Sequence, residues 1–220
     1  MAESEGRRPL KVRDANFAVS IAKWLSQRNI TPNQISIASV FFAFLAALSF
    51  LAIPSSTGAG LSAVFAGLFI QMRLLCNLFD GMVAIEGGKS TPAGELFNDI
   101  PDRIADPLIL VSAGYAISVI QWGDVLGWCA GILAVLTAYV RTLGVSMGAP
   151  VSFKGPMAKQ HRMAVMTGAS ALTVVESFFS GNGSVMGYVI LVALIGIIIG
   201  SIVTVINRTK DIYNYLENKH

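Results

Sequence analysis

The sequence predicts an all-α integral membrane protein with six transmembrane helices, preceded by an N-terminal amphipathic helix at the membrane interface. Hydrophobic residues make up 54% of the 220 residues and charged residues only 13%, whereas about 25% charged residues is typical of soluble domains. Six successive apolar runs are each long enough to cross a hydrocarbon core of roughly 30 Å. These observations exclude an ordinary soluble domain, and residues 1–220 are expected to form a single membrane domain.

The N-terminal part, residues 1–32, is expected to be a cytoplasmic segment that ends in the interfacial helix. Its apolar residues share one helical stripe, at Phe17, Ile21, Trp24 and Leu25. Lys23 and Arg28 lie on other faces. This pattern is typical of a helix lying in the interface with its Trp at headgroup level, and a soluble helix packed on the loops is the alternative.

The six apolar runs form the predicted bundle, residues 33–206. They cover residues 34–53, 61–85, 96–120, 126–147, 163–180 and 184–206. Thr31 and Pro32 are expected to cap the first of these helices, since Thr supplies an oxygen to free amides and Pro fits the first turn. The cytoplasmic tail, residues 207–220, is expected to form a short interfacial helix.

The distribution of basic residues predicts the orientation. Loops 54–60, 121–124 and 181–183 contain no Lys or Arg, while the opposite side carries Lys89, Lys154, Lys159, Arg162, Arg208, Lys210 and Lys219. The positive-inside rule therefore places both termini on the cytoplasmic side of a membrane, of which a bacterial-type inner membrane is our expectation. Topology also accounts for the net charge of +3, so we predict no nucleic-acid partner.

Residues 77–106 hold most of the acidic side chains at membrane depth, where ionisable groups usually mark a functional site. One helical stripe contains Arg73, Asn77, Asp80 and Ala84, and a second contains Glu95, Asn98, Asp102 and Asp106, with Asp99 and Arg103 beside it. The short connection makes the helices antiparallel neighbours, so the stripes can converge. Carboxylate and amide oxygens suit Mg²⁺ or Mn²⁺. A polar network that only joins two helices is the alternative.

The order Asn77-x-x-Asp80-Gly81-x-x-Ala84, then Gly94-x-x-x-Asn98-x-x-x-Asp102, resembles the signature of the CDP-alcohol phosphotransferase family. That signature reads D-x-x-D-G-x-x-A-R, then G-x-x-x-D-x-x-x-D. Asn77 and Asn98 stand where Asp is expected, and Ile85 stands where Arg is expected. Further similarities to the family extend over nearly the whole chain, at Thr31-Pro32-Asn33, Arg141, Gly155, Lys159 and Arg162.

The resemblance implies a transferase of phospholipid biosynthesis. Such an enzyme transfers a phosphatidyl or similar group from a CDP-activated lipid, such as CDP-diacylglycerol, to an alcohol and releases CMP. The resemblance implies a Mg²⁺ or Mn²⁺ cofactor held by Asp80 and Asp102 with Asn77 and Asn98, and Asp102 as general base. It also implies nucleotide contacts from Asn77, Asp80, Gly81 and Ala84, and a homodimer in the membrane lipid.

Two amides in place of carboxylates should weaken or remove one of two adjacent metal ions, because such pairs need negative charge. Glu95, Asp99 and Asp106 lie near enough in sequence to compensate. Arg73 is expected to orient the site by pairing with a carboxylate such as Asp80 or Asp106.

Arg141, Lys159 and Arg162 are expected to bind an acceptor phosphate or the donor lipid phosphate. These cations favour a phosphorylated polyol such as glycerol 3-phosphate as acceptor, slightly ahead of serine, inositol-type or unphosphorylated alcohols. Two other functions remain open from the sequence: a catalytically degenerate family member, and a transporter that uses the acidic cavity for a cation or small solute.

Overall fold

The computed structural model describes residues 16–54, 58–89, 93–179 and 186–218. These residues form the helices α1 (Asn16–Gln27), α2 (Pro32–Ala52), α3 (Ala59–Glu86), α4 (Gly94–Tyr115), α5 (Gly123–Ser146), α6 (Lys159–Phe179) and α7 (Tyr188–Glu217). Within the described ranges there is no strand, which confirms the predicted all-α class. Helices α2 to α7 each overlap one of the six predicted apolar runs, although α4 ends at Tyr115 and the predicted run continued to residue 120.

In the part of the chain that the structure describes, four helices are long and apolar enough to cross a membrane: α2, α3, α5 and α7. Large apolar side chains remain exposed on their outer faces, among them Phe41, Leu61, Ile132 and Val192. Extensive apolar surface of this kind fits contact with lipid, so the chain is an integral membrane protein. Helix α4 carries four ionisable side chains from Asp99 to Asp106, and α6 carries Lys159, Arg162 and Glu176. The membrane crossing of α4 and α6 stays a prediction.

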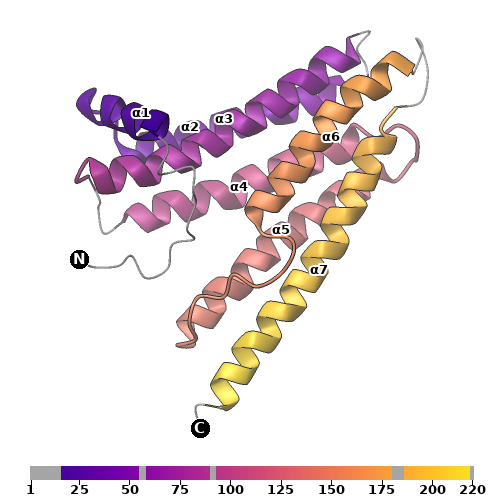
Figure 1. The fold of residues 1–220 in the computed structure, drawn as a ribbon. Coiled ribbons are helices and arrows are strands. Elements are labelled where there is room, and N and C mark those ends of the chain that lie inside the picture. Colours follow the sequence, from indigo (N-terminus) through magenta and orange to yellow (C-terminus); the bar gives the residue numbers. More distant parts are fainter. Residues whose placement is uncertain (1–15, 55–57, 90–92, 180–185, 219–220) are drawn as a thin grey trace.

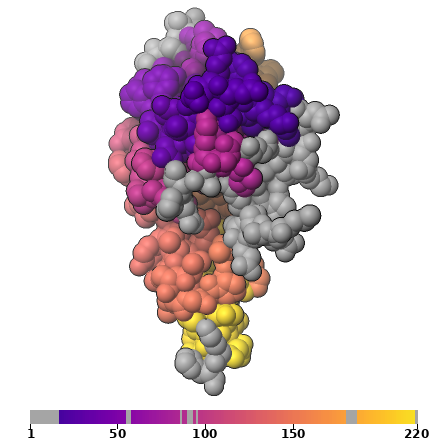
Figure 2. All heavy atoms as spheres, turned by 90° about the vertical axis from the view of Figure 1, so that its left-hand side faces the viewer, coloured from indigo at the N-terminus to yellow at the C-terminus, as the bar shows by residue number. Residues whose placement is uncertain are grey.

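The long helices converge at one end of the molecule and separate toward the other (Figure 1). Helix α2 packs against α3 and α4, α4 against α5, α3 against α6, and α7 against α5 and α6. The free ends of α3 and α4 therefore diverge from the free ends of α5 and α7. Figure 2 shows the resulting elongated shape, with α1 in indigo near one end and the last turns of α7 in yellow at the other.

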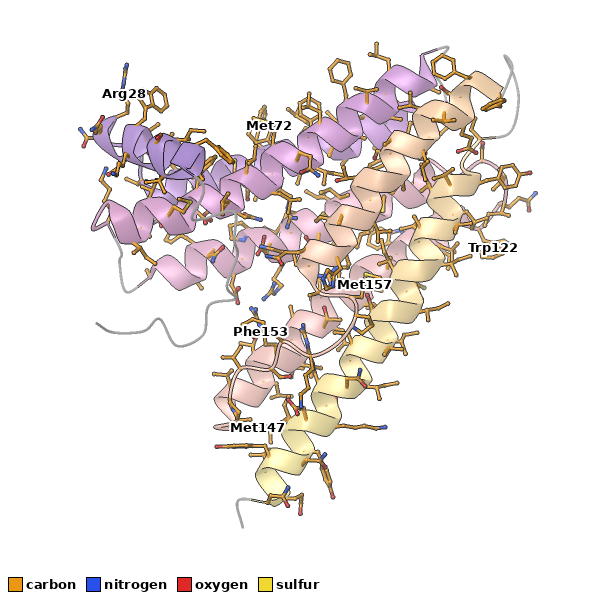
Figure 3. The ribbon with its side chains drawn as sticks, in the orientation of Figure 1. Arg28, Met72, Trp122, Met147, Phe153 and Met157 are labelled. Atoms are coloured by element: carbon orange, nitrogen blue, oxygen red, sulfur yellow. The ribbon has the colours of Figure 1, made fainter. Side chains whose placement is uncertain are left out.

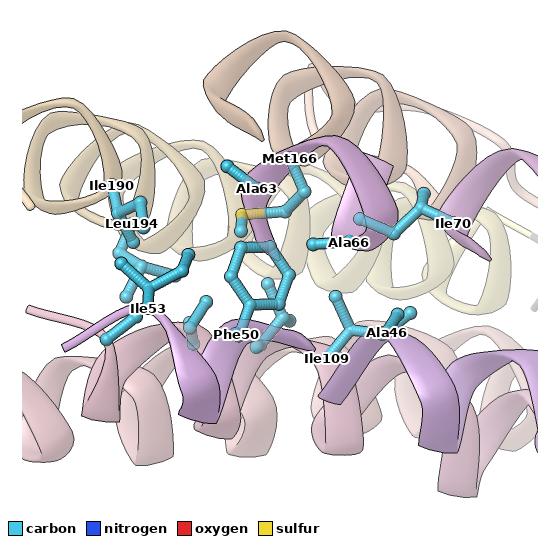
Figure 4. Close-up of a cluster of buried hydrophobic side chains, with 14 of the residues drawn as sticks. Ala46, Phe50, Ile53, Ala63, Ala66, Ile70, Ile109, Met166, Ile190 and Leu194 are labelled. Atoms are coloured by element: carbon cyan, nitrogen blue, oxygen red, sulfur yellow. The ribbon is translucent and has the colours of Figure 1, made fainter. Parts of the chain in front are cut away.

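The hydrophobic core lies where the helices converge (Figure 4). Fully buried side chains from the six helices α2 to α7 meet there, including Phe50, Ile70, Ile109, Met166 and Ile190. Alanines such as Ala46, Ala63 and Ala66 fill the positions between them. Small residues let membrane helices approach closely, so this end of the bundle is tightly packed and holds the site-bearing helices in register.

The closest approach of α4 and α5 depends on Gly114 and Gly127. A Cβ atom on Gly127 would lie 2.8 Å from the Val111 carbonyl oxygen and 2.9 Å from the Gly114 Cα. Backbone atoms cannot move aside as a side chain can, so Gly127→Ala is expected to destabilise the protein by about 1–3 kcal/mol.

Thermal unfolding of the detergent-purified protein measures this effect. Gly168→Ala in α6 is the matched control, because a Cβ there meets nothing within 4 Å, and we expect it to be neutral or slightly stabilising. An unchanged melting temperature for Gly127→Ala would show that α4 and α5 do not cross this closely.

The start of α2 confirms the predicted cap. Thr31 Oγ1 accepts a hydrogen bond from the Gln34 backbone N at 3.3 Å, and Gln34 Oε1 accepts one from the Thr31 backbone N at 3.0 Å. The predicted helix before it is also present as α1, whose Ala18 and Ala22 pack against α3 while Phe17, Ile21 and Trp24 stay exposed. Its place in the membrane interface remains a prediction.

The prediction of a separate helix in the tail was wrong. Helix α7 continues without a break from Tyr188 through Glu217. Residues 207–217 contain no Gly or Pro, and the residues present are tolerated in a helix interior. The helix therefore extends past the apolar run.

Candidate active site

Helix α2 packs against both α3 and α4, and the polar side chains of α3 and α4 meet each other beside it. Arg73 Nη2 donates hydrogen bonds to Asp102 Oδ1 at 3.0 Å and to Asp106 Oδ1 at 2.6 Å. Asn77 Nδ2 donates to the same Asp102 oxygen at 3.1 Å. The two polar stripes therefore converge as the sequence indicated, and Arg73 pairs with Asp106 and Asp102.

Asp102 is surrounded by donors on both of its carboxylate oxygens. Oδ1 accepts from Arg73 and Asn77, and Oδ2 is paired with the ammonium group of Lys159 from α6. The Asp102 side chain is 7% exposed and that of Lys159 is 29% exposed. Lys159 therefore reaches from the open side of the site to a carboxylate that the two other donors hold in place.

Asp80 lies deeper and has a different environment. Its Oδ2 accepts a hydrogen bond of 2.7 Å from Ser36 Oγ of α2, and its Oδ1 accepts one of 2.5 Å from the Gly81 backbone N. Asp80 is only 4% exposed, and among the described residues no basic side chain forms an ion pair with it. Of the two partners suggested for Arg73, the structure shows Asp106. Asp80 instead accepts a hydrogen bond from Ser36.

Asp106 is the centre of a buried ion-pair network. It binds Arg73 through Oδ1 and Arg162 Nη2 through Oδ2, the latter at 2.7 Å. Arg162 Nη1 also donates to Thr137 Oγ1 at 3.2 Å and to the Met157 carbonyl at 2.9 Å. The two arginines thus engage both oxygens of Asp106, which does not line the cavity.

Asp99 also has cationic partners, which bears on its predicted role as a compensating acid. Arg103 Nη2 lies 3.1 Å from Asp99 Oδ2, and Arg141 Nη2 lies 3.3 Å from Asp99 Oδ1. These pairs are partly exposed. The side chain of Glu95, the remaining acid proposed to compensate, lies outside the described residues.

A cavity of about 240 Å³ opens beside these groups, toward the ends where the helices separate. Its polar lining residues are Asn77, Asp80, Asn98, Asp99, Asp102, Arg103, Thr137, Arg141, Lys159, Gln160, Arg162 and Arg208. The connection between α5 and α6, with Phe153 and Met157, runs through the angle between the helices (Figure 3). Gly81 lines the cavity but Ala84 does not. Three acidic residues face five basic residues here, which suits ligands carrying several negative charges.

Several lining or supporting residues were not singled out from the sequence, among them Arg208 and Ser36. Arg208 on α7 donates from Nη1 to the Thr137 carbonyl at 2.6 Å and from Nε to the Lys154 carbonyl at 3.1 Å. The only sign of Arg208 in the sequence was an arginine at the end of an apolar run, and the positive-inside rule already explains an arginine at that position. Ser36 follows the Thr31 cap by little more than one turn, and nothing in a single sequence distinguishes it from a packing serine.

The donor set of the cavity fits one hard divalent cation. Within the described ranges no three His, Cys, Asp or Glu side chains gather as a metal site. Asp80 and Asp102, with the amides of Asn77 and Asn98, supply two carboxylates and two neutral oxygens. Mg²⁺ commonly takes one or two carboxylates and completes its shell with water and substrate phosphates.

No family model matches the chain. It is 29% identical over 161 residues to the archaetidylinositol phosphate synthase of Aeropyrum pernix, covering 73% of this chain and 77% of the relative. The signature stripes of α3 and α4 agree with this similarity. Both the signature and this relative support the resemblance to the CDP-alcohol phosphotransferase family. Members of this family are transferases of substituted phosphate groups.

A second relative is also named as a synthase of an inositol phosphate lipid. The chain is 26% identical over 152 residues to the phosphatidylinositol phosphate synthase of Streptomyces avermitilis, covering 66% of this chain and 59% of that relative.

The fold is shared with the phosphatidylinositol phosphate synthase of Mycobacterium tuberculosis. Its structure with CDP-DAG bound has a TM-score of 0.69 at 17% identity, over 90% of this chain and 94% of that one. Its structure in complex with manganese and citrate also has a TM-score of 0.69, at 16% identity, over 89% of this chain and 88% of that one.

Proposed function

We propose that this protein transfers a phosphatidyl group from a CDP-activated lipid to the hydroxyl of an inositol phosphate, with release of CMP. The observation that carries the proposal is one cavity in which Asp80 and Asp102 face a set of five basic side chains. In this reaction the acceptor oxygen bonds to the phosphorus that bears the lipid. The bond from that phosphorus to CMP breaks, and the acceptor hydroxyl loses its proton.

The donor half of the proposal rests on α3 and α4. Asp80 and Asp102, assisted by Asn77 and Asn98, would hold Mg²⁺ or Mn²⁺, and the manganese complex of the mycobacterial fold neighbour supports this assignment. A bound divalent ion stabilises the negative charge that develops on the leaving phosphate. Gly81 lines the cavity without a side chain, which leaves room for a nucleotide diphosphate. Ala84 lies outside the cavity lining, so its nucleotide contact rests on the family resemblance alone.

The acceptor half rests on the basic side chains. Arg141, Lys159 and Arg162 line the cavity together with Arg208. A guanidinium group can donate two parallel hydrogen bonds to two oxygens of one phosphate. Both relatives are named as synthases of inositol phosphate lipids. These names shift our proposed acceptor from glycerol 3-phosphate to an inositol phosphate.

Asp102 is the proposed general base. Arg73 and Asn77 fix the orientation of its carboxylate, and the cavity gives an acceptor access to it. A base must lie within hydrogen-bond reach of the proton that it removes.

We further propose that the cavity and both termini face the cytoplasm and that the enzyme works as a homodimer.

The test uses the purified full chain in nanodiscs with CDP-diacylglycerol, Mg²⁺ or Mn²⁺, and a panel of acceptors. We expect CMP release with inositol phosphate, loss of release with EDTA, and recovery when the metal is restored. Preference for glycerol 3-phosphate, serine or free inositol would overturn the acceptor. No CMP with any acceptor, from folded protein that still binds CDP-diacylglycerol, would favour a degenerate family member. Metal uptake into proteoliposomes without any CDP-lipid would favour the transporter.

A further inference from the structure

We infer that Lys159 acts as a built-in second cation of the site. The protein then binds one divalent metal ion, held chiefly by Asp80, while the Lys159 ammonium neutralises most of the charge of Asp102. This inference rests on the proposed function, since it assigns the division of charge within the same cavity. It concerns metal stoichiometry and affinity, which can be measured independently of turnover.

Asp80 is the cavity carboxylate that forms no ion pair with a described basic side chain. It is 96% buried and lines the cavity, yet its oxygens accept hydrogen bonds only from Ser36 and the Gly81 backbone. Both donors are neutral, and no described basic side chain pairs with it. An ionised carboxylate is expensive to bury without a cation. Asp80 is therefore the place in the cavity where a metal ion would supply a counter-charge that no ion pair provides.

Asp102 is in the opposite situation. Arg73 and Lys159 are both paired with it, and Asn77 adds a third donor. A metal ion that took Oδ2 as a ligand would have to displace the Lys159 ammonium or lie beside it against electrostatic repulsion. Asp102 can therefore assist in holding one metal ion beside Asp80, but its charge does not require a second ion.

The other acids described near the cavity do not provide for a second metal ion. Asp99 is paired with Arg103 and Arg141, and Asp106 with Arg73 and Arg162. The two amides, Asn77 and Asn98, carry no charge. With five basic residues already lining the cavity, each further divalent ion adds repulsion. The same cations remain available to a diphosphate and a phosphorylated acceptor.

The test is equilibrium Mn²⁺ binding to the full chain in nanodiscs of neutral lipid, with free Mn²⁺ quantified by electron paramagnetic resonance. We expect one Mn²⁺ per wild-type chain and loss of this binding in Asp80→Asn. In Lys159→Met, the removed positive charge should tighten Mn²⁺ binding by about tenfold, while CMP release should fall by about tenfold or more because the ammonium no longer faces the phosphates.

This pairing of tighter metal binding with slower turnover separates the alternatives. If Lys159 bound only the acceptor phosphate, Lys159→Met would leave Mn²⁺ affinity unchanged, and if its role were structural, Mn²⁺ affinity would fall. Lys154→Met is the matched control, since Lys154 is exposed and pairs with Asp211, and it should change neither quantity. Either alternative outcome, or two Mn²⁺ per wild-type chain, would overturn the inference. Tighter Mn²⁺ binding in a protein that releases no CMP would uphold it and reject the proposed function.

Discussion

Asp102→Asn is expected to lower the rate of CMP release by about three to four orders of magnitude. The substitution keeps the size of the side chain but removes the proposed proton acceptor and the charge that Arg73 and Lys159 pair with. Loss of a general base typically costs about 10²–10⁴ in rate, and the disturbed charge distribution around the phosphates adds to that loss. Single-turnover CMP release at saturating CDP-diacylglycerol and Mn²⁺ measures the chemical step.

Asp211→Asn is the control for this prediction. Asp211 pairs with Lys154 near the end of α7, away from the lining of the active-site cavity, so its loss should leave CMP release unchanged. Asp102→Glu keeps the charge and the proton acceptor but moves both along a longer side chain, and it should recover only part of the rate. If Asp102→Asn retained more than about a tenth of the wild-type rate, the role of general base would have to move to another residue.

The parts of the site that lie on one helix were predictable from the sequence. Residues three and four apart share a helical face, so the order of Arg73, Asn77 and Asp80 was enough to define a polar stripe on α3. The same rule placed Asp102 and Asp106 on α4. A short connection between two apolar runs then made the two stripes neighbours, and the structure brings Asn77 and Asp102 within 3.1 Å of each other.

The contacts between helices that are distant in sequence were not predictable in this way. Ser36 reaches Asp80 from α2, and Arg208 joins the cavity from α7. Such contacts depend on the crossing angles and the packing of the helices. No spacing pattern in a single sequence predicts these quantities. Lys159 was predicted to bind phosphate, but its contact with Asp102 could not be foreseen, because spacing within α6 contains no information about α4.

The two proline-containing turns of α4 illustrate a related limit. Pro101 and Pro107 lie within the helix, where proline removes a backbone hydrogen bond and usually ends or bends a helix. The apolar run nevertheless predicted a continuous helix through both, and the structure confirms it. The neighbouring helices α2 and α5 pack along α4, and packing of this kind outweighs local propensity.

Asp106→Ala is expected to reduce the free energy of unfolding by about 3–5 kcal/mol, because removing one partner of a buried ion pair leaves charge uncompensated. Arg73 is fully buried, and its Nε and Nη1 have no hydrogen-bond partner among the described residues, so Asp106 and Asp102 supply its counter-charge. Arg162 would keep only neutral partners, Thr137 and the Met157 carbonyl. Thermal unfolding of the detergent-purified variant measures the loss.

The exposed pair of Asp211 and Lys154 provides the comparison for that measurement. Their side chains are 31% and 68% exposed, so Asp211→Ala should cost no more than about 1 kcal/mol.

The triple variant Arg73→Met, Asp106→Leu, Arg162→Met replaces the whole network by apolar groups and should regain much of the stability lost in Asp106→Ala. It should still lack activity, since Arg73 also holds Asp102 and Arg162 lines the cavity. If the triple variant recovers stability but not CMP release, the network serves to position the site. Equal melting temperatures for Asp106→Ala and Asp211→Ala would contradict a buried network at this position.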